Sequence, residues 1–570
     1  MLHRFYHGLT VLLAATSMLV VGCASSSSDK QGDVKSAQVK TKATAKAAPT
    51  TPTVSEEKVA EAHAHYAQGV VFDMQDEPEL ALEEYTKSAL QDPANDELVL
   101  EISRRYLQLK QTDKALEILT NAVAAPNASG AVYARLGMVY SRLGQDDLAL
   151  QSSEKAIQKS PTLLTGYQNL FLIHLQKNHS AEAFKVLDKA AKQPETSAEF
   201  LINLAELFAT LERQVPSLQT NTHKAALGVL NRAAKLKPSS LVLRIKLADG
   251  FNVLGDRTNA LHFYQELLNQ VSSRPAVQDD IRAKMADIYL KNKEPQKASE
   301  QLKEIVKDDP ANSQAYYYLG SLAYDDKKLP EAEDFFHKVL LLNEEMEQAY
   351  YDLAGVQINL EKPKEALSTL EHARKKFKPS FVLEFFSGLA FSKEKDFTNA
   401  LQHLTSAEVI AKAEEPKRLN ALFYFEVGSV YERASNFEEA EKYFEKCLSQ
   451  SPNFTEALNY LGYMWAEHGI KLEKARDLIE KAVKLEPKNP AYLDSFAWVL
   501  YKLNQPKEAL ARIEEAIKLT PEPDATLYDH LGDIYAALKQ DDKARTAWRR
   551  SLEVEQNEEV RKKLWRDKPQ

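Results

Sequence analysis

Apolar and small residues recur along the chain with a period of about 34 residues, from near residue 62 to near residue 557. In one clear unit, separations of three, four and seven positions link Tyr133, Leu136, Gly137 and Tyr140. Residues with this spacing lie on one face of a helix. A second group with helical spacing follows at Ala149, Ser153 and Ala156. The pattern therefore predicts a helix pair that is repeated many times.

The twentieth place of the unit, counted from Gly130, is the most regular position. It holds Ala81, Ala115, Ala149, Ala183, Ala226, Ala260, Ala298, Ala332, Ala366, Ala400, Ala440, Ala475, Ala509 and Ala544. Small residues here and at the eighth place allow two helices to approach closely. We predict an all-α chain with roughly fourteen helix pairs over residues 56–570, including a C-terminal capping helix. Irregularities are expected near 210–223, as a loop that separates two helices, and near 408–417.

The residue types at these places resemble the tetratricopeptide repeat, whose pattern has an aromatic residue, Leu, Gly, an aromatic residue, Ala, an aromatic residue, Ala and Pro. Tyr133, Gly137, Ala149 and Pro161 are examples. The resemblance covers nearly all of residues 56–570. It implies a right-handed α-α superhelix, or solenoid, in which the first helix of each pair lines a concave groove that binds other proteins.

By the family pattern, the second, fifth, ninth, twelfth and thirteenth places face this groove. In the C-terminal half, the candidate binding residues at these places are Tyr317, Tyr324, Tyr351, Phe385, Phe425, Asn459, Tyr463, Asp494, Trp498, Tyr501, Asp529 and Asp533. Aromatic residues among polar groups are typical of protein-binding surfaces. The alternative for any single aromatic residue is that it packs between neighbouring repeats.

The amino terminus predicts export and a lipid anchor. An apolar run from Leu9 to Val21 is too short for a comfortable membrane span and is typical of a signal peptide, here residues 1–22. The segment that ends at Cys23 resembles the lipobox of bacterial lipoproteins, which implies lipidation of Cys23. By the family's sorting rule, Ala24 indicates the outer membrane. The alternative is an uncleaved anchor helix. Residues 23–55 are polar, without periodicity, and predict a disordered tether.

Composition narrows the function further. The formal net charge is -9, which argues against a broad nucleic-acid interface. Cys447 has no cysteine partner once Cys23 is lipidated, and its place in the repeat predicts core packing. The 13 histidines form no metal-ligand spacing, and no phosphate loop or nucleophile motif is present. We therefore predict no catalytic residues, no metal site, no cofactor and no enzymatic activity.

Residues 491–552 resemble the C-terminal repeats of large bacterial tetratricopeptide lipoproteins, with Tyr492 to Trp498 and Tyr528 to Asp533 as the most similar segments. Some of those proteins are adaptors that hold a carboxyl-terminal processing protease and deliver cell-wall hydrolases to it. The resemblance implies a membrane-anchored scaffold that faces the periplasm. The alternative is an assembly or export lipoprotein for pili, secretion or exopolysaccharide. An enzyme is a third possibility, and it would require a catalytic domain that the sequence does not show.

Overall fold

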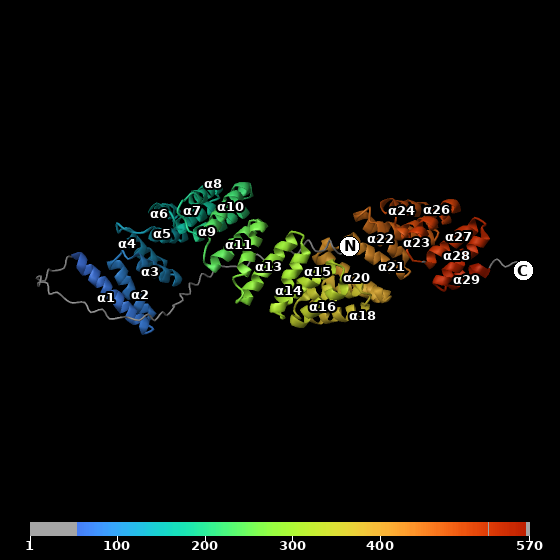
Figure 1. The fold of residues 1–570 in the computed structure, drawn as a ribbon, viewed down its shortest axis with the longest axis horizontal. Coiled ribbons are helices and arrows are strands. Elements are labelled where there is room, and N and C mark those ends of the chain that lie inside the picture. Colours follow the sequence, from blue (N-terminus) through green and yellow to red (C-terminus); the bar gives the residue numbers. More distant parts are fainter. Residues whose placement is uncertain (1–53, 523, 566–570) are drawn as a thin grey trace. The chain divides into compact units, whose positions relative to one another are not determined.

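The structure of the protein is a computed structural model that describes residues 54–522 and 524–565. Within these ranges all regular structure is helical, with 29 α-helices, α1 to α29, and two short 3-10 helices (Figure 1). The predicted all-α fold is confirmed. Residues 1–22 and Cys23, together with nearly all of the predicted tether, lie outside the described residues.

The chain divides into two compact units, residues 1–125 and 126–570. The helices of the first unit are α1 (Val54–Met74), α2 (Pro78–Gln91), α3 (Asp96–Gln108) and α4 (Thr112–Val123). In this unit α1 packs against α2, α2 against α3, and α3 against α4. Fully buried side chains at these contacts include Ala81, Ala115 and Leu119.

The second unit holds twelve helix pairs and one final helix. Its helices are α5 (Gly130–Arg142), α6 (Asp146–Lys159), α7 (Leu164–Gln176), α8 (Ser180–Ala191), α9 (Ala198–Gln214), α10 (Gln219–Lys235), α11 (Leu241–Val253), α12 (Arg257–Leu268), α13 (Pro275–Lys291), α14 (Pro295–Asp308), α15 (Ser313–Asp325), α16 (Leu329–Leu342), α17 (Glu347–Asn359), α18 (Pro363–Lys376), α19 (Phe381–Lys393), α20 (Phe397–Glu414), α21 (Ala421–Arg433), α22 (Phe437–Gln450), α23 (Thr455–Glu467), α24 (Leu472–Leu485), α25 (Pro490–Lys502), α26 (Pro506–Leu519), α27 (Ala525–Ala537), α28 (Asp541–Val554) and α29 (Glu558–Trp565).

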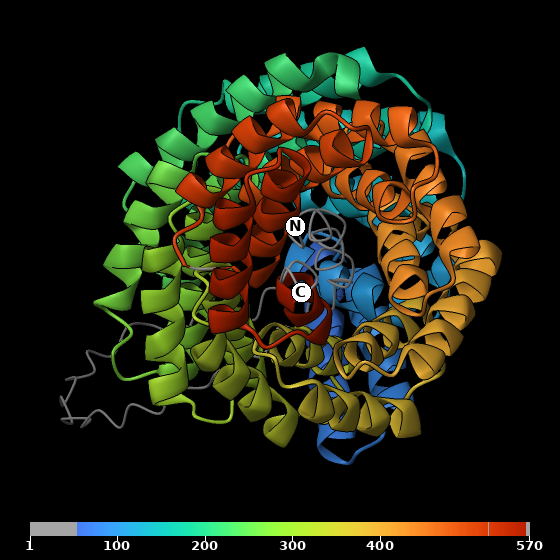
Figure 2. The same cartoon turned by 90° about the vertical axis from the view of Figure 1, so that its right-hand side faces the viewer.

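Contacts within the second unit run mainly between neighbours in the sequence. Consecutive helices pack against each other, and first helices of successive pairs also meet, as in α5 with α7 and α23 with α25. The pairs of this unit follow a curved path around a central axis (Figure 2). This arrangement is a solenoid, as the 34-residue period predicts. Among residues 54–522 and 524–565, no helix combines the length and the apolar character that crossing a membrane requires.

Small residues hold the two helices of each pair together. All fourteen alanines at the twentieth place have no exposed surface. The glycine at the eighth place works in the same way: a Cβ atom at Gly428 would lie 2.8 Å from Cδ1 of the buried Phe444. Any larger residue at such a position must push the helices apart or displace the facing ring. These contacts explain why the twentieth place holds alanine in every pair, whereas the eighth place also admits Phe171 in the unit of Ala183.

The connection inside most pairs is a tight turn that contains a left-handed residue, and the turn between α23 and α24 contains two, Gly469 and Lys471. Thirteen of the fourteen pairs have such a residue, and α9 with α10 is the exception. In three pairs it is glycine: Gly144, Gly255 and Gly469. In the other ten it is Asp76, Lys110, Asn178, Lys293, Lys327, Glu361, Lys395, Ser435, Asn504 or Lys539, with φ between 54° and 64°. A positive φ disfavours residues that carry a Cβ atom, so the turn geometry is maintained against a local cost.

The two irregular units contain longer helices. A loop was expected between Thr210 and His223, but α9 continues to Gln214, a 3-10 helix spans Pro216–Leu218, and α10 begins at Gln219. That expectation is wrong, because the additional residues extend both helices and bury Leu211 and Thr222. Likewise α20 continues to Glu414 before a second 3-10 helix at Pro416–Arg418.

Candidate functional site

The candidate binding residues all lie on the first helices of their pairs, from α15 to α27. The structure separates them into residues that pack between repeats and residues that form one cluster. Tyr317 and Tyr324 are half-buried and bonded to the next repeat: the Tyr317 hydroxyl donates to Asp352 Oδ2 at 2.7 Å, and Asn359 Nδ2 donates to the Tyr324 hydroxyl at 2.9 Å. Both side chains therefore couple adjacent repeats as well as lining the first-helix face.

Tyr351 and Phe385 are buried, in agreement with the alternative that single aromatic residues pack between neighbouring repeats. Tyr351 is 3% exposed and Phe385 is 6% exposed. The ring of Phe385 lies 5.5 Å from the ring of Phe381 and 5.9 Å from that of Phe423, centroid to centroid. Aromatic side chains at this place fill the space between successive first helices. Their burial stabilises the fold more than exposure to water would.

Phe425 occupies the same place one repeat later and also packs between repeats. It is half-buried, and its ring lies 5.2 Å from Phe454 and 5.4 Å from Tyr460. Cys447, in the second helix of this pair, has no exposed surface, and burial raises the pKa of its thiol to about 12. The prediction that Cys447 is a core residue is confirmed.

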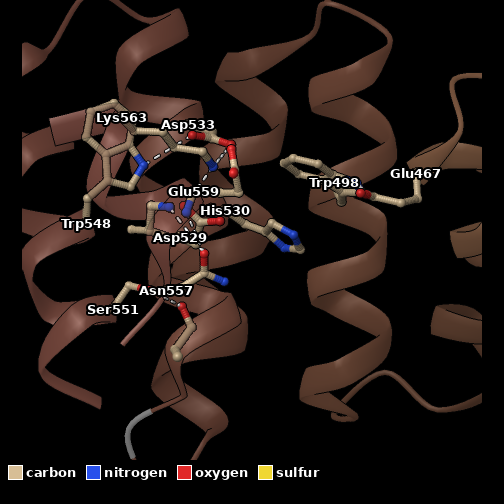
Figure 3. Close-up of polar contacts among 12 residues, drawn as sticks. Glu467, Trp498, Asp529, His530, Asp533, Trp548, Ser551, Asn557, Glu559 and Lys563 are labelled. Atoms are coloured by element: carbon tan, nitrogen blue, oxygen red, sulfur yellow. Dashed lines mark hydrogen bonds and ion pairs between the residues drawn. The ribbon is translucent and has the colours of Figure 1, made fainter. Parts of the chain in front are cut away.

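Six of the predicted residues come together in the last repeats. They are Tyr463 on α23, Asp494, Trp498 and Tyr501 on α25, and Asp529 and Asp533 on α27. We call this group, together with Glu467, His530, Trp548 and Lys563, the C-terminal cluster. Figure 3 shows most of its members, with the His530 ring pointing toward Trp498 and Lys563 lying beside Asp533.

Trp498 is the centre of the cluster. Its indole Nε1 donates a hydrogen bond of 2.7 Å to Glu467 Oε2 on the preceding first helix. The indole stacks on the imidazole of His530, with ring centroids 4.0 Å apart and planes 17° apart, and on Tyr501, with centroids 5.1 Å apart. Trp498 thus connects three successive first helices, α23, α25 and α27.

His530 is a buried cation partner that the sequence analysis did not single out. Its Nδ1 lies 2.8 Å from Asp494 Oδ1, and the residue is 5% exposed. Burial by itself lowers the pKa of His530, but the charge of Asp494, its hydrogen bond, and the charges of Asp529 and Asp533 outweigh burial and raise the pKa above its usual value. A protonated imidazole stacked on indole gains a cation–π interaction in addition to the ion pair.

The capping helix α29 completes the cluster. Lys563 Nζ lies 2.8 Å from Asp529 Oδ1 and 2.7 Å from Asp533 Oδ2, and Trp548 Nε1 donates to Asp533 Oδ1 at 3.1 Å. Burial raises the pKa of Asp533, although Lys563 opposes this shift. Lys563 follows Asp529 by 34 residues, so it occupies the fifth place of a further first helix. The 34-residue separation from Asp529 is the feature of the sequence that would have identified Lys563 as a member of the cluster.

The chemistry of the cluster suits recognition. The buried stack of Trp498 and His530 holds the half-buried rings of Tyr463 and Tyr501 in place at small entropic cost, and the carboxylates around them accept hydrogen bonds. Among residues 54–522 and 524–565, no group of three or more His, Cys, Asp or Glu side chains is placed to hold a metal ion.

Comparisons with known proteins identify the repeat family. Models of the tetratricopeptide repeat match residues 130–162, 270–473 and 495–557. The chain is therefore a tetratricopeptide repeat protein, and such repeats make it a scaffold for protein–protein interaction. A similar curated protein is the TPR repeat-containing protein PA4667 of Pseudomonas aeruginosa, which is 26% identical over 221 residues, or 38% of this chain and 36% of that protein.

Other similar proteins match with lower sequence identity. Protein O-mannosyl-transferase TMTC3 of Homo sapiens is 24% identical over 204 residues, which is 36% of this chain and 22% of that protein. The matches thus span about a third of the first relative and less of the second. Among solved structures, the APC/C hetero-tetramer Cut9-Hcn1 aligns with 85% of this chain and 96% of that chain, with a TM-score of 0.38 and 14% identity.

Proposed function

We propose that this chain is a lipid-anchored adaptor of the bacterial cell envelope that holds a periplasmic protease or cell-wall enzyme and presents protein substrates to it. The observation that carries the proposal is the C-terminal cluster, in which the half-buried rings of Tyr463 and Tyr501 and the carboxylates of Asp494 and Asp529 lie around the buried, stacked Trp498 and His530. A repeat scaffold that presents such a surface binds protein partners rather than turning over a small substrate.

The amino terminus supplies the anchoring part of the proposal. A diacylglycerol on Cys23 carries two acyl chains, which is enough for stable attachment where one chain is not. Attachment to one membrane raises the local concentration of bound partners relative to each other without any new contact. This effect explains how a scaffold accelerates a reaction that another protein catalyses. The similarity to a repeat protein of Pseudomonas aeruginosa supports a bacterial setting.

Affinity capture from detergent-solubilised membranes tests the partner. The full chain is compared with a Tyr463→Ser, Tyr501→Ser variant, which alters two half-buried rings and leaves the buried Trp498 in place. A Tyr66→Ser, Tyr318→Ser variant is the matched control, because these rings are exposed and lie outside the cluster. A protease or hydrolase that the wild type and the control recover and the first variant loses supports the adaptor. Recovery of pilus or export components instead favours an assembly lipoprotein, and identical recovery by all three chains contradicts a role for the cluster.

A second measurement tests the anchor. Cys23→Ser is expected to move the protein from the membrane fraction to the soluble fraction of the envelope and to abolish labelling by a fatty-acid analogue. Retention of the variant in the membrane fraction would indicate an uncleaved anchor helix in place of the lipid.

A further inference from the structure

A hollow of about 710 Å³ is lined by four successive helix pairs, near the ends of their first helices. Its lining residues come from the turn between α17 and α18, from α19 and α20, from α21 and α22, and from the end of α23. Seven of the eleven lining residues are exposed, so the hollow is open and not a closed cavity. Small ligands bind in sites that enclose most of their surface, whereas an open site across several repeats suits a length of polypeptide.

The hollow contains two cations that no carboxylate neutralises. Lys395 and Arg433 are both exposed, and no carboxylate oxygen among the described side chains lies within 4.0 Å of either charged group. A third basic residue, Lys393, is already paired, because its Nζ lies 2.6 Å from Glu361 Oε1. Two positive groups on neighbouring helix pairs are therefore available to an anionic ligand.

The three carboxylates that line the hollow do not cancel these two charges. Glu361 is used by its ion pair, and Glu467 accepts the indole N–H of Trp498 at 2.7 Å. Glu432 is half-buried, and burial raises its pKa, which the charges of two neighbouring basic side chains only partly oppose. Such a carboxyl group binds a proton more readily than an exposed glutamate does, so it repels an incoming anion less.

Two aromatic rings add an apolar component to the hollow. Phe397 and Phe437 are the first residues of α20 and α22, and both are half-buried. Of the fourteen second helices that the structure describes, only these two begin with phenylalanine, and ten of the other twelve begin with proline or a polar residue. The Phe437 ring contacts the imidazole of His468, with ring centroids 4.0 Å apart. Aromatic residues beside charged groups are typical of surfaces that bind proteins.

The hollow adjoins the C-terminal cluster, because Glu467 belongs to both. A polypeptide bound in the hollow can therefore continue onto the cluster without leaving the first-helix side of the repeats. This continuity favours a segment of the same protein partner over an unrelated ligand.

We infer that the hollow binds an extended acidic segment of the partner protein, in which two Asp or Glu side chains about three residues apart flank an apolar side chain. Lys395 and Arg433 belong to neighbouring pairs; helices in contact lie about 8–10 Å apart, and three extended residues span about 10 Å. The two carboxylates pair with these cations, and the apolar side chain packs against Phe397 or Phe437. The inference rests on the proposed function, because it specifies the chemistry of a segment in the partner.

Fluorescence anisotropy with short peptides tests the inference on the full chain. The probe is a fluorescein-labelled peptide, Gly-Glu-Leu-Ser-Glu-Gly, with an amidated C-terminus so that only its side chains carry carboxylates. We expect it to bind about tenfold more tightly than the same peptide with glutamine in place of glutamate, and to bind more weakly as salt rises. The net charge of the chain is -9, so general electrostatic attraction would instead favour a version with lysine.

Several results with these peptides overturn the inference. Recognition of carboxylates is excluded if the glutamate peptide does not bind, or if the glutamine peptide binds equally well. Tighter binding of the lysine peptide gives the ligand the opposite charge. If a glutamine peptide with a free C-terminal carboxylate binds as tightly as the amidated glutamate peptide, the hollow holds a chain end and not an internal segment.

Two double variants place the contact. Lys395→Gln with Arg433→Gln removes the unpaired cations and should lower the affinity for the glutamate peptide to that for the glutamine peptide. Lys327→Gln with Arg142→Gln removes the same charges from exposed residues at the same places of other repeats, and should change the affinity by less than about twofold. Lys327 and Lys395 both have a left-handed φ, so the two variants affect the backbone equally. An equal loss in both variants shows a non-specific charge effect and overturns the inference.

Phe397→Thr with Phe437→Thr separates the apolar contact from the charges. Threonine occupies the same place in α4, as Thr112, so the substitution is compatible with the repeat. The wild type should bind the leucine peptide more tightly than Gly-Glu-Ser-Ser-Glu-Gly, and this variant should bind the two peptides equally. An unchanged preference for leucine in the variant contradicts the role given to the rings. Equal binding of the two peptides by the wild type contradicts it independently of any variant.

The peptide and capture experiments fail separately. If the glutamate peptide does not bind but capture of an envelope enzyme persists, this inference is wrong and the proposed function stands. If the peptide binds through Lys395 and Arg433 but no enzyme is captured, the hollow is a site for acidic segments and the proposed function is wrong.

Discussion

Two glycine substitutions of opposite expected sign test the close packing of the repeats. Gly532 on α27 faces the indole of Trp548 on α28, and a Cβ atom there would lie 2.3 Å from both Cδ1 and Nε1 of the ring. Gly228 on α10 has no atom within 4 Å of the same position and an ordinary helical φ. The pair therefore gives the same chemical change in a filled and an open environment.

The magnitude follows from these distances. Contact between carbon atoms is comfortable at about 3.5 Å, so Gly532→Ala must displace the Trp548 ring by roughly 1 Å. The ring is 6% exposed, and a shift of this size breaks its 3.1 Å hydrogen bond to Asp533. Overpacking costs about 1–3 kcal/mol, which exceeds the gain of about 0.5–1 kcal/mol from replacing glycine in a helix. Gly228→Ala keeps only that gain and should stabilise α10.

Hydrogen exchange measured by mass spectrometry is the suitable assay, because an array of repeats unfolds locally. Gly532→Ala should speed exchange in residues 525–554 by roughly ten- to a hundredfold, since each 1.4 kcal/mol is a factor of ten. Gly228→Ala should slow exchange in residues 219–235. Slower exchange around Gly532 in its variant, or faster exchange around Gly228, would refute the packing argument.

Three further predictions concern the C-terminal cluster and Cys447. The raised pKa of His530 means that its ion pair with Asp494 contributes stability that is fully present below the unfolded pKa of about 6.5 and is lost as pH rises through the higher folded pKa. The stability difference between wild type and His530→Gln, measured from about pH 5 to about pH 9 by local exchange, should therefore shrink with rising pH, and a constant difference contradicts the pair. Lys563→Met should weaken docking of α29 by roughly 1–2 kcal/mol, because it leaves Asp533 without its cation, and should speed exchange of residues 558–565 alone. Cys447 should resist a maleimide in the native protein at neutral pH and react in denaturant, so rapid native labelling would exclude its burial.

The periodic part of the fold was predictable because the same small residues recur in each repeat where its two helices contact each other. Alanine at the twentieth place is fully buried in every pair, which a single spacing rule anticipates. The helix lengths at the irregular units were not predictable from spacing. The residues from Thr210 to His223 include Leu211 and Thr222, whose burial makes longer helices more stable than a loop.

The site was only partly predictable, because a groove position in the repeat does not determine burial. Tyr351 and Phe385 occupy the fifth place of their repeats, as Asp494 and Asp529 do in later repeats. The two aromatic side chains are buried, whereas Asp494 contacts His530 and Asp529 contacts Lys563. What decides is the neighbour: the ring of Phe385 meets Phe381 and Phe423, whereas Asp494 meets the imidazole of His530. The spacing in the sequence predicts which residues lie on the first-helix face. Only the structure shows which side chain of the neighbouring repeat each of them contacts.

The left-handed turn residues lower the stability of the folded protein, because most of them carry a Cβ atom at a positive φ. Ten of these turns carry a residue with a Cβ atom, and several are lysines, such as Lys327 and Lys395. Exchange of such a residue for glycine relieves about 1 kcal/mol of local strain at a turn between the two helices of a pair. The melting temperature of a Lys327→Gly, Lys395→Gly variant would measure this reserve. The stability of the solenoid is thus adjustable at these turns, without any change to the alanines and glycines that hold each helix pair together.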